Sequence, residues 1–519
     1  MKLKKKNTLM AAPKEKSGIF NLFLNGIEKL GNRLPSPVMI FLFFSILIMV
    51  VSAFLANAGV SVIHPATGDT MDAINLLSIP QLQAFLGNVV GNFQGFPPLG
   101  LVLVVMIGAG LAEKTKFMET AMRGSIANLP KGLLTTMIFL VGIMANAVGD
   151  AGFIILPPLA ATLFLSVKRH PLIGLFAAFA GVAAGFAANL IINMGDVLLA
   201  AFTLQAAQTI DAYINISPAM NMYFLFISTF MLTAAGVFVT EKIIAPRFEG
   251  EELPEELLNE ATVEAISPEE KRGIKLATLS VLAYAAILVF LSLVPLYNGQ
   301  AFLVGSNGGL MDADSTFMRG LVPIITLLFF IPGLVYGIAT KQIKSSFDLV
   351  KLIGDSLSDM GGYILLAFAA SQFIALFNQS NIGIILAVEG AHFLQDIGLT
   401  GGPLFVAFIL FCAFINLFIG SASAKWAMLA PIFIPMFMLM GYDPAQTQIA
   451  FRIGDSITNP ISPLFPYFPM IVGFASKYKK NIGMGTLISN MIPYSLVFGV
   501  LWIILFLVFF FLGLPLGPA

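Results

Sequence analysis

Charged residues are scarce in this sequence: Asp, Glu, Lys and Arg together make up 11% of the 519 residues, whereas 58% are hydrophobic. That composition excludes an ordinary soluble globular protein. Cysteine is nearly absent as well, because Cys412 is the only one, so no disulfide can form within the chain. We expect no cofactor, no bound metal beyond a coupling ion, and no nucleic-acid partner.

Long apolar runs take the place of charge. Runs of about 20 apolar residues, the length of helix that crosses roughly 30 Å of hydrocarbon, recur along nearly the whole chain. They are continuously apolar rather than alternating, which favours helices over the strands of a membrane barrel. The first run begins near Pro37 and is long enough to span, so we interpret it as an uncleaved helix. The sequence therefore predicts an all-α polytopic protein of the lipid bilayer.

The basic residues indicate how the chain is threaded through the membrane. All but three of the 28 Lys and Arg residues fall into tight groups. These groups lie at Lys2 to Arg33, Lys114 to Lys131, Lys168 and Arg169, Lys242 to Lys275, Lys341 to Lys351, and Lys477 to Lys480. If each group is cytoplasmic, as the positive-inside rule expects, the stretches between them leave the cytoplasm and return. This predicts a multi-pass protein of the cell membrane with a cytoplasmic N-terminus and an external C-terminus.

Two segments of the first half do not fit a plain series of spans. Residues 132–167 are too few for two full spans and a turn, and they break at ANAVGDAG. This predicts a re-entrant hairpin with Asn146 and Asp150 at its tip, near mid-depth. Residues 171–207 carry GFAANLIINMGD in their middle, which predicts a helix that is unwound at its centre.

The second half repeats this order with its direction reversed. A helix at 357–380 precedes a second hairpin, 402–440, which breaks at GSASAKW. A broken helix, 446–475, contains FRIGDSITNPISP, and a last helix covers 485–512. The unit of helix, hairpin, broken helix and helix thus occurs twice, entering from opposite sides. Such an inverted-topology repeat places its substrate and ion sites near the midplane.

Counting gives about nine transmembrane helices plus two re-entrant hairpins. The expected divisions are a basic N-terminus (1–35), a first helix with an external segment (36–97), a first repeat (98–241), an acidic cytoplasmic linker (242–273), two connecting helices (274–340) and a second repeat (357–513).

Two of the three basic residues outside the cytoplasmic groups, Lys425 and Arg452, fall within the membrane. An unpaired charge there is costly, so such residues face a cavity or a partner of opposite charge. The acidic candidates at similar depth are Asp150, Asp196 and Asp455. Arg452 and Asp455 are spaced i, i+3, which permits a pair on one helix turn.

Each of these residues also has a purely structural interpretation. Lys425 paired with an aspartate would lock the hairpin, and Arg452 with Asp455 would be an internal ion pair. Trp426 would be packing in an apolar arm, or it would stack on a substrate ring beside the polar tip. The asparagines Asn189, Asn193, Asn416 and Asn459 would satisfy backbone groups that the helix breaks free.

The C-terminal motifs resemble those of a known family. GSASAKWAMLAPIF followed by GYDPAQTQIAFRIGDSITNPISPLFPY is similar to the p-aminobenzoyl-glutamate transporter family, AbgT. The resemblance covers essentially the full chain in length, hairpin order and span count, and VGDAGFIILPPLAA and ANLIINMGDVLLAA match more loosely.

The resemblance implies a homodimeric carrier of p-aminobenzoyl-glutamate, a folate breakdown product, with possible export of sulfonamide antimetabolites. It assigns family positions to Asp196, Ser423, Trp426, Pro444, Arg452, Asp455 and Pro463. Such a substrate has two carboxylates and a flat ring, which suit cationic or N–H donors and an aromatic wall. We therefore expect Arg452, Ser421 and Ser423 to hold polar groups of the substrate, with Lys425, Asn189 and Asn193 beside them.

The coupling ion is left open by the sequence. A proton would be carried by Asp196 or Asp455, with Asp150 a further candidate, because burial and a neighbouring Arg or Lys set the pKa of such an acid. Sodium would instead be held by tip carbonyls with Asn146 and Asn416, and with Asn459 nearby.

Three rivals remain at this stage. A sodium-coupled dicarboxylate or citrate carrier also uses paired hairpins, although the motif with Trp426 and Arg452 argues against it. An intramembrane aspartyl protease needs a glycine two residues before its Gly-Asp pair, and the chain has Ala147, Asn193 and Arg452 at those positions. A channel would conduct far faster than a carrier turns over. We expect a transporter and not an enzyme.

Overall fold

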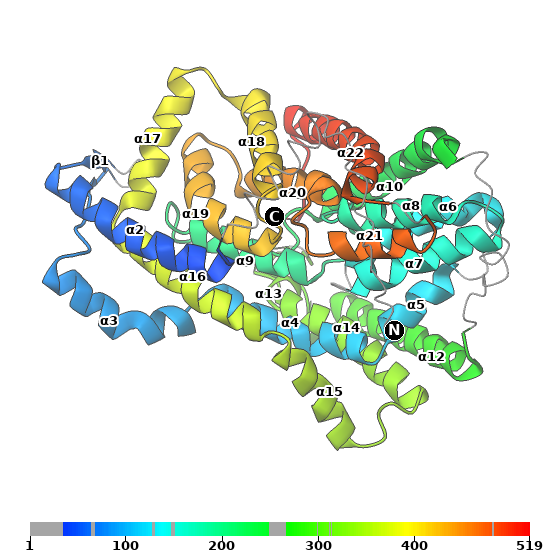
Figure 1. Cartoon of the computed structure of the whole chain (residues 1–519). Coiled ribbons are helices and arrows are strands. Elements are labelled where there is room, and N and C mark those ends of the chain that lie inside the picture. The colour runs from blue at the N-terminus through cyan, green and yellow to red at the C-terminus, as the bar shows by residue number, and fades with distance from the viewer. Residues whose placement is uncertain are drawn as a thin grey trace, which may run out of the picture.

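The computed structural model describes residues 35–63, 68–126, 130–146, 151–248, 266–297, 299–310, 312, 314–479 and 482–518. Helices dominate this part of the chain (Figure 1), and eight helical segments are long and apolar enough to cross a membrane. One of the eight is a hairpin arm, α19 (Ala422–Leu439). The other seven and two broken helices make nine spans within the described residues. The predicted all-α polytopic fold with two hairpins is confirmed.

The first repeat contains the elements that the sequence predicts, with one short helix added. In chain order its elements are α4 (Pro97–Lys114), the added α5 (Phe117–Ile126), η1 (Lys131–Leu133), α6 (Leu134–Ala145), α7 (Ala151–Ser166), α8 (Pro171–Ala183), α9 (Met194–Ala207) and α10 (Met222–Val239). The hairpin is α6 with α7, and the broken helix is α8 with α9. The last helix runs on into a π-helical turn, η3 (Thr240–Ile244), and a 3-10 turn, η4 (Ala245–Phe248).

The second repeat follows the same order. Its elements are α15 (Ser346–Ser358), α16 (Gly361–Gln379), α17 (Ile382–Asp396), α18 (Gly401–Asn416), α19, α20 (Pro444–Thr458), η5 (Asn459–Ile461), α21 (Phe468–Ser476) and α22 (Met484–Leu512). Here the hairpin is α18 with α19, and the broken helix is α20 with α21. Figure 1 shows α20 in the middle of the molecule, close to α18 and α19.

Local sequence explains where the broken helices start and stop. Residues 184–193 between α8 and α9 are not helical, and α9 restarts at a capping box in which Asn193 and Asp196 satisfy each other's backbone N–H groups. In the second repeat, Asp443 caps α20 and Pro444 occupies its first turn. Pro460 lies in the 3-10 turn that follows α20, where a residue without a backbone N–H cannot continue the helical bonding.

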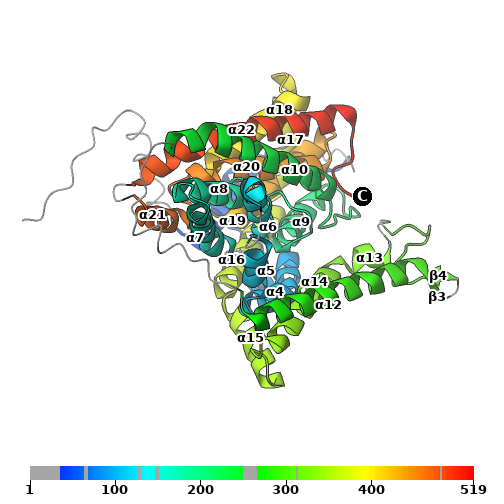
Figure 2. The same cartoon turned by 90° about the vertical axis from the view of Figure 1, so that its right-hand side faces the viewer.

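The connecting helices lie to one side of the two repeats. They are α12 (Pro268–Leu293) and α14 (Leu321–Ala339), joined through β3 (Pro295–Tyr297), β4 (Gln300–Ala301) and the short α13 (Thr316–Arg319). Figure 2 shows α12 and α14 side by side below the body, with β3 and β4 at their far end. Helix α14 packs closely on α4, because a Cβ at Gly108 would lie 2.1 Å from the carbonyl oxygen of Thr326.

The N-terminal segment has more structure than the sequence indicates. After α2 (Pro37–Asn57), the expected external segment forms an antiparallel pair, β1 (Ser61–Ile63) with β2 (Thr70–Asp72), and a helix, α3 (Ile79–Gln94). Helix α3 packs on α16, where Asn92 donates a hydrogen bond of 3.1 Å to Gln372. The first connecting helix begins at Pro268 rather than near 274, because Ser267 and Glu270 form a capping box there.

Candidate functional site

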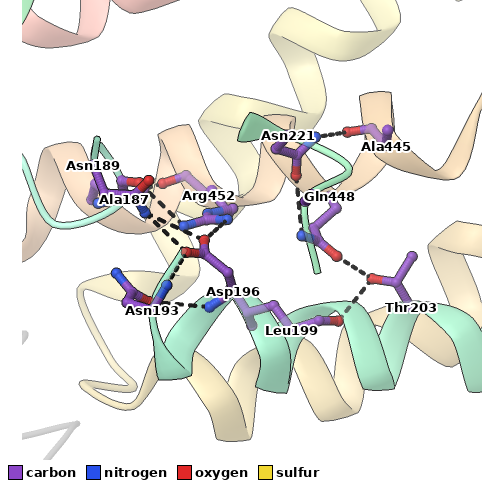
Figure 3. A network of polar contacts seen from close by, with 12 residues as sticks. Ala187, Asn189, Asn193, Asp196, Leu199, Thr203, Asn221, Ala445, Gln448 and Arg452 are labelled. Atoms are coloured by element: carbon purple, nitrogen blue, oxygen red, sulfur yellow. Dashed lines mark hydrogen bonds and ion pairs between the residues drawn. The ribbon is translucent and has the colours of Figure 1, made fainter. Parts of the chain in front are cut away.

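Helix α20 carries the polar centre of the molecule. Nearly every side chain from Pro444 to Ile457 is buried, including Arg452 and Asp455. Two buried ion pairs involve this helix, one through each of these residues. The ion pair of Arg452 is shown in Figure 3. Both charges that the sequence places within the membrane therefore have acidic partners.

The first pair joins the two repeats. Nη1 of Arg452 lies 2.6 Å from Oδ1 of Asp196 in the first turn of α9. Asn189 and the backbone N–H of Asn193 also donate to this carboxylate, at 3.1 Å and 2.8 Å. Nη2 of Arg452 donates to the carbonyl oxygen of Ala187 in the non-helical break. The break in the first repeat is thus held by a cation from the second (Figure 3).

A hydroxyl of α20 strengthens this connection. The backbone N–H of Ala187 donates to Oγ of Ser456 at 3.1 Å, and that hydroxyl donates to the carbonyl of Arg452. Both backbone polar groups of Ala187, its N–H and its C=O, are therefore bound by side chains of α20. In the middle of a membrane such groups need a partner inside the protein.

The second pair lies within the second repeat. Nζ of Lys425, on α19, is 2.5 Å from Oδ1 of Asp455 and also donates to Oδ1 of Asn416 at the end of α18. Nδ2 of Asn416 donates to the carbonyl of Asp455 at 2.5 Å and to Oδ1 of Asn459 at 2.8 Å. Both arms of the second hairpin are thereby bound to α20.

The pairing of Arg452 with Asp455 suggested by their i, i+3 spacing is wrong. Helix α20 is intact across both residues, so the spacing itself is not at fault. The two side chains leave the helix about 60° apart, and each meets a different neighbour. Asp196 of α9 forms an ion pair with Arg452, whereas Lys425 of the hairpin forms one with Asp455.

The two hairpin tips use an asparagine in similar ways. Nδ2 of Asn146 donates to the carbonyl of Val182 near the end of α8, as Nδ2 of Asn416 does to that of Asp455 near the end of α20. Nδ2 of Asn459 donates to the carbonyl of Ala183, which links the two breaks. The Oδ1 atoms differ, because that of Asn146 is buried with no hydrogen-bond partner in the described part of the chain.

The remaining predicted site residues lie around this centre. Ser421 caps α19, and its hydroxyl is 3.3 Å from that of Ser423. Both serines are only partly buried. Pro444 begins α20, and Pro463 is buried just beyond η5. Asp150 falls outside the described residues. Among the described residues, no group of three or more His, Cys, Asp or Glu side chains could hold a metal ion.

Trp426 is covered on its face and at its edge. The indole is fully buried and stacks on Phe451, with ring centroids 4.6 Å apart. Its Nε1 donates to Oγ1 of Thr203 at 2.9 Å. An aromatic wall open to a substrate is therefore not present in this conformation, and stacking on the substrate stays a prediction.

Three further polar residues were missed by the sequence interpretation. Thr203, Asn221 and Gln448 are fully or almost fully buried and hydrogen-bonded to one another between α9 and α20 (Figure 3). The available signal was the position of Gln448, one helical turn before Arg452. A single amide or hydroxyl in an apolar run carries no motif of its own, so the other two gave none.

Comparison with known proteins assigns the chain to a family. A family model described as "AbgT putative transporter family" matches residues 22–519. The p-aminobenzoyl-glutamate transport protein of Escherichia coli (strain K12) is 37% identical over 502 residues, which is 95% of each chain.

Two solved structures have the same fold. The YdaH transporter of Alcanivorax borkumensis, described as having an unusual topology, matches with a TM-score of 0.88 at 37% identity, covering 93% of this chain and 100% of that one. MtrF of Neisseria gonorrhoeae, described as illuminating a class of antimetabolite efflux pumps, matches with a TM-score of 0.88 at 43% identity, covering 96% and 99%. The protease alternative loses its support, because these relatives are transporters. The chain belongs to the AbgT family of membrane transporters.

Proposed function

We propose that the protein is a secondary active carrier of p-aminobenzoyl-glutamate or a close analogue, and that Arg452 binds a carboxylate of the substrate. The name of the relative from Escherichia coli supports this substrate class. The observation that carries the proposal is the burial of Arg452 together with an unused hydrogen-bond donor on its side chain. Its guanidinium is buried where the two repeats meet, and its Nε has no hydrogen-bond partner among the described residues. A guanidinium with an unused donor suits a carboxylate ligand.

The substrate and Asp196 would compete for this guanidinium. Two carboxylates beside one guanidinium leave a net negative charge in a site of low dielectric constant, which is unfavourable. Protonation of Asp196 removes that charge and releases Arg452 to the substrate. Substrate binding and proton uptake would therefore occur together, which makes Asp196 the coupling acid in this proposal.

The second pair is less suited to this exchange. Lys425 compensates the carboxylate of Asp455 within the second repeat, and Asn416 accepts from Lys425 and donates to the backbone carbonyl of Asp455. Asp455 is therefore the alternative coupling acid. Sodium is the alternative ion, held by amide oxygens of Asn146, Asn416 or Asn459 together with carbonyls at the helix breaks.

The similarity to MtrF favours a second cargo. That protein represents a class of antimetabolite efflux pumps, and sulfonamide antimetabolites resemble the p-aminobenzoyl ring. We infer that the carrier also exports compounds of this type. Because the ring and not the glutamate is shared, such compounds would depend less on Arg452 than p-aminobenzoyl-glutamate does.

We infer further that the carrier is a homodimer of the cell membrane. The clusters of Lys and Arg in the sequence support a cytoplasmic N-terminus and an external C-terminus. The dimer rests on the family resemblance and would be tested by the mass of the protein in detergent or nanodiscs.

The proposal is tested by uptake of labelled p-aminobenzoyl-glutamate into proteoliposomes of the purified protein. A pH gradient is imposed first, and then a sodium gradient at equal pH on the two sides. Asp196→Asn and Asp455→Asn are measured beside the parent protein. We expect accumulation that follows the pH gradient and disappears in Asp196→Asn.

Other outcomes would redirect the assignment. Accumulation driven by sodium alone and retained in Asp196→Asn would refute proton coupling at this residue. Loss only in Asp455→Asn would move the coupling acid to the second pair. No accumulation by folded, inserted protein would refute the substrate, and sulfonamides and dicarboxylates would then be compared as competitors. Conductance far above carrier turnover would indicate a channel.

A further inference from the structure

A directional chain of hydrogen bonds runs from the second hairpin to the start of α20. Nε1 of Trp426 donates to Oγ1 of Thr203 at 2.9 Å, and Thr203 donates to Oε1 of Gln448 at 2.5 Å. Nε2 of Gln448 donates to Oδ1 of Asn221 at 3.0 Å. Nδ2 of Asn221 then donates to the carbonyl of Ala445 at 2.9 Å. Gln448 and Asn221 each accept from the preceding donor and donate to the next acceptor, whereas Trp426 and Thr203 also donate to the carbonyl oxygen of Leu199, at 3.2 Å and 3.0 Å.

The chain ties together parts of both repeats. Trp426 and Gln448 belong to the hairpin and broken helix of the second repeat, whereas Thr203 lies on α9 of the first and Asn221 directly precedes α10. All four side chains are buried, with an exposure of 1% for Asn221 and 0% for Thr203, Gln448 and Trp426. The structure around the chain is therefore closed to solvent.

The chain lies on one side of the ion pair of Arg452 and Asp196. Thr203 is toward the end of α9 and Gln448 toward the start of α20, so both lie away from the two helix breaks (Figure 3). At the breaks the burial is less complete, because Ser421, Ser423 and residues 190–192 are partly exposed. The site is thus more tightly sealed at the end that holds the chain.

A seal of neutral hydrogen bonds suits a part that opens during transport. Parting Thr203 from Gln448 uncovers a hydroxyl and an amide, whereas parting Arg452 from Asp196 uncovers two charges in a site of low dielectric constant. Gln448 precedes Arg452 by four residues on α20, so the two side chains lie on one face of that helix. A ligand on Arg452 would therefore lie beside the chain.

We propose that Thr203, Gln448 and Asn221 are positioning residues of the transport cycle: their hydrogen-bond chain fixes the indole of Trp426 and keeps this end of the site closed until the substrate occupies Arg452. The inference deepens the proposed function and rests on it. It gives Trp426 a role before any stacking on the substrate, because the indole N–H is free only after it leaves Thr203 and the neighbouring carbonyl oxygen of Leu199.

Trp426 can report on the chain directly. The sequence has two tryptophans. The other one, Trp502 on α22, donates to the hydroxyl of Ser228, which is not part of this hydrogen-bond chain. In a Trp502→Phe background the emission of Trp426 is read alone. The comparison is between Thr203→Val, which keeps the shape and removes the hydroxyl, and Thr203→Ser, which keeps the hydroxyl. Transport of p-aminobenzoyl-glutamate is measured on the same proteins.

We expect Thr203→Val to shift the emission of Trp426 to shorter wavelength, because the indole N–H loses the nearer of its two acceptors and keeps only the carbonyl oxygen of Leu199. We expect its transport efficiency to fall by about 3-fold to 20-fold, the range of one hydrogen bond between membrane helices. Thr203→Ser should restore both. Asn221→Ala breaks the far end of the chain and should lower transport in the same direction, so it serves as the test if Thr203→Val does not fold.

Unchanged emission and transport in Thr203→Val would overturn the inference. Loss of transport with unchanged Trp426 emission would also overturn it, because the residue would then act without positioning the indole. A spectral shift with unchanged transport would also overturn it, because the hydrogen-bond chain would then position Trp426 without affecting the transport cycle. If the parent protein does not accumulate the substrate, the substrate assignment fails separately, and binding of a sulfonamide to the same variants then decides whether the chain positions Trp426 for another ligand.

Discussion

The two buried ion pairs of α20 differ in the elements that they join. Arg452 reaches across to Asp196 in the first repeat, whereas Asp455 is bound by Lys425 in the hairpin of its own repeat. Their side chains are similarly buried, so depth does not distinguish them. In carriers with inverted repeats, one part of the molecule rocks against another around a central site. A pair between repeats can respond to that motion, whereas a pair within one repeat can travel with it.

The comparison teaches that a buried charge is interpreted from its partner and not from its depth alone. Lys425 is a charge within an apolar run, yet its neighbours Asp455 and Asn416 satisfy it locally. Arg452 keeps an unused donor and is held by a residue of the other repeat. We therefore propose that the pair of Arg452 binds the substrate and that the pair of Lys425 has a supporting role.

The largest effect is expected from Arg452→Gln. Removing one member of a buried charge pair at a binding site lowers affinity by about 2–5 kcal/mol, which is roughly 30-fold to several thousand-fold. The measurement is equilibrium binding of labelled p-aminobenzoyl-glutamate to the protein in nanodiscs. Arg319→Gln is the matched control, because Arg319 is an exposed arginine at the end of α13 and should bind normally. Equal affinity in the two variants would contradict the assignment.

The next largest effect is expected in Asp196→Asn, which should retain substrate binding but lose transport. An asparagine imitates the protonated acid, so Arg452 stays available and the substrate should bind at least as well as in the parent. Gradient-driven accumulation should be lost, because no proton can be released. Without substrate, the unpaired Arg452 should lower the stability by about 3–5 kcal/mol. Thermal unfolding with and without substrate measures this, and weak binding to Asp196→Asn would count against the exchange.

A smaller effect is expected when both charges of the other pair are removed. Lys425→Met combined with Asp455→Asn replaces the pair by neutral groups of similar size, a change that is often neutral for stability. We expect affinity to stay within about threefold of the parent, a difference below 1 kcal/mol, and coupling to the pH gradient to persist. Uptake assays with and without the gradient measure both. Loss of coupling as complete as in Asp196→Asn would erase the distinction between the pairs.

A further comparison, of stability and not of affinity or transport, is between the two hairpin tips. Asn416 bonds to Lys425 and to three acceptors in the second repeat, whereas Asn146 bonds to two backbone carbonyls. Asn416→Ala leaves buried hydrogen-bonding partners unsatisfied, which should lower the free energy of unfolding by about 1–3 kcal/mol. Asn146→Ala should lower it by less. Thermal unfolding of the two variants tests the order. A reversed order would indicate that Asn146 has a further ligand, such as sodium, in the native membrane.

Much of the architecture could be predicted because it depends on short-range signals. The Gly-rich and Asn-containing tips around Asn146 and Ser421 mark where apolar helices break. The direction of each span, which the clusters of Lys and Arg predict, stays a prediction. Helix α3 was missed because its apolar residues alternate with Gln and Asn, and it is held by Gln372 of a distant helix. That kind of contact has no local trace in the sequence.

The buried charged residues could also be identified from the sequence, but their partners could not. Lys425 and Arg452 stand out as charges in apolar runs, and the motifs around them resemble those of one family. Which acid meets which base depends on how α9 and α19 pack around α20, and helical spacing alone suggested the wrong pair. Thr203 and Asn221 remained hidden, because hydroxyls and amides occur singly in many membrane helices and gain meaning only from their neighbours.

The central claim is that a substrate carboxylate takes the place of Asp196 on Arg452 while Asp196 takes up a proton. The most direct measurement is calorimetric binding of p-aminobenzoyl-glutamate in buffers of different ionisation enthalpy, which counts the protons exchanged on binding. The account predicts net proton uptake on binding by the parent protein and no such uptake by Asp196→Asn, with binding retained. The same proton uptake in both proteins, or none in the parent, would contradict it.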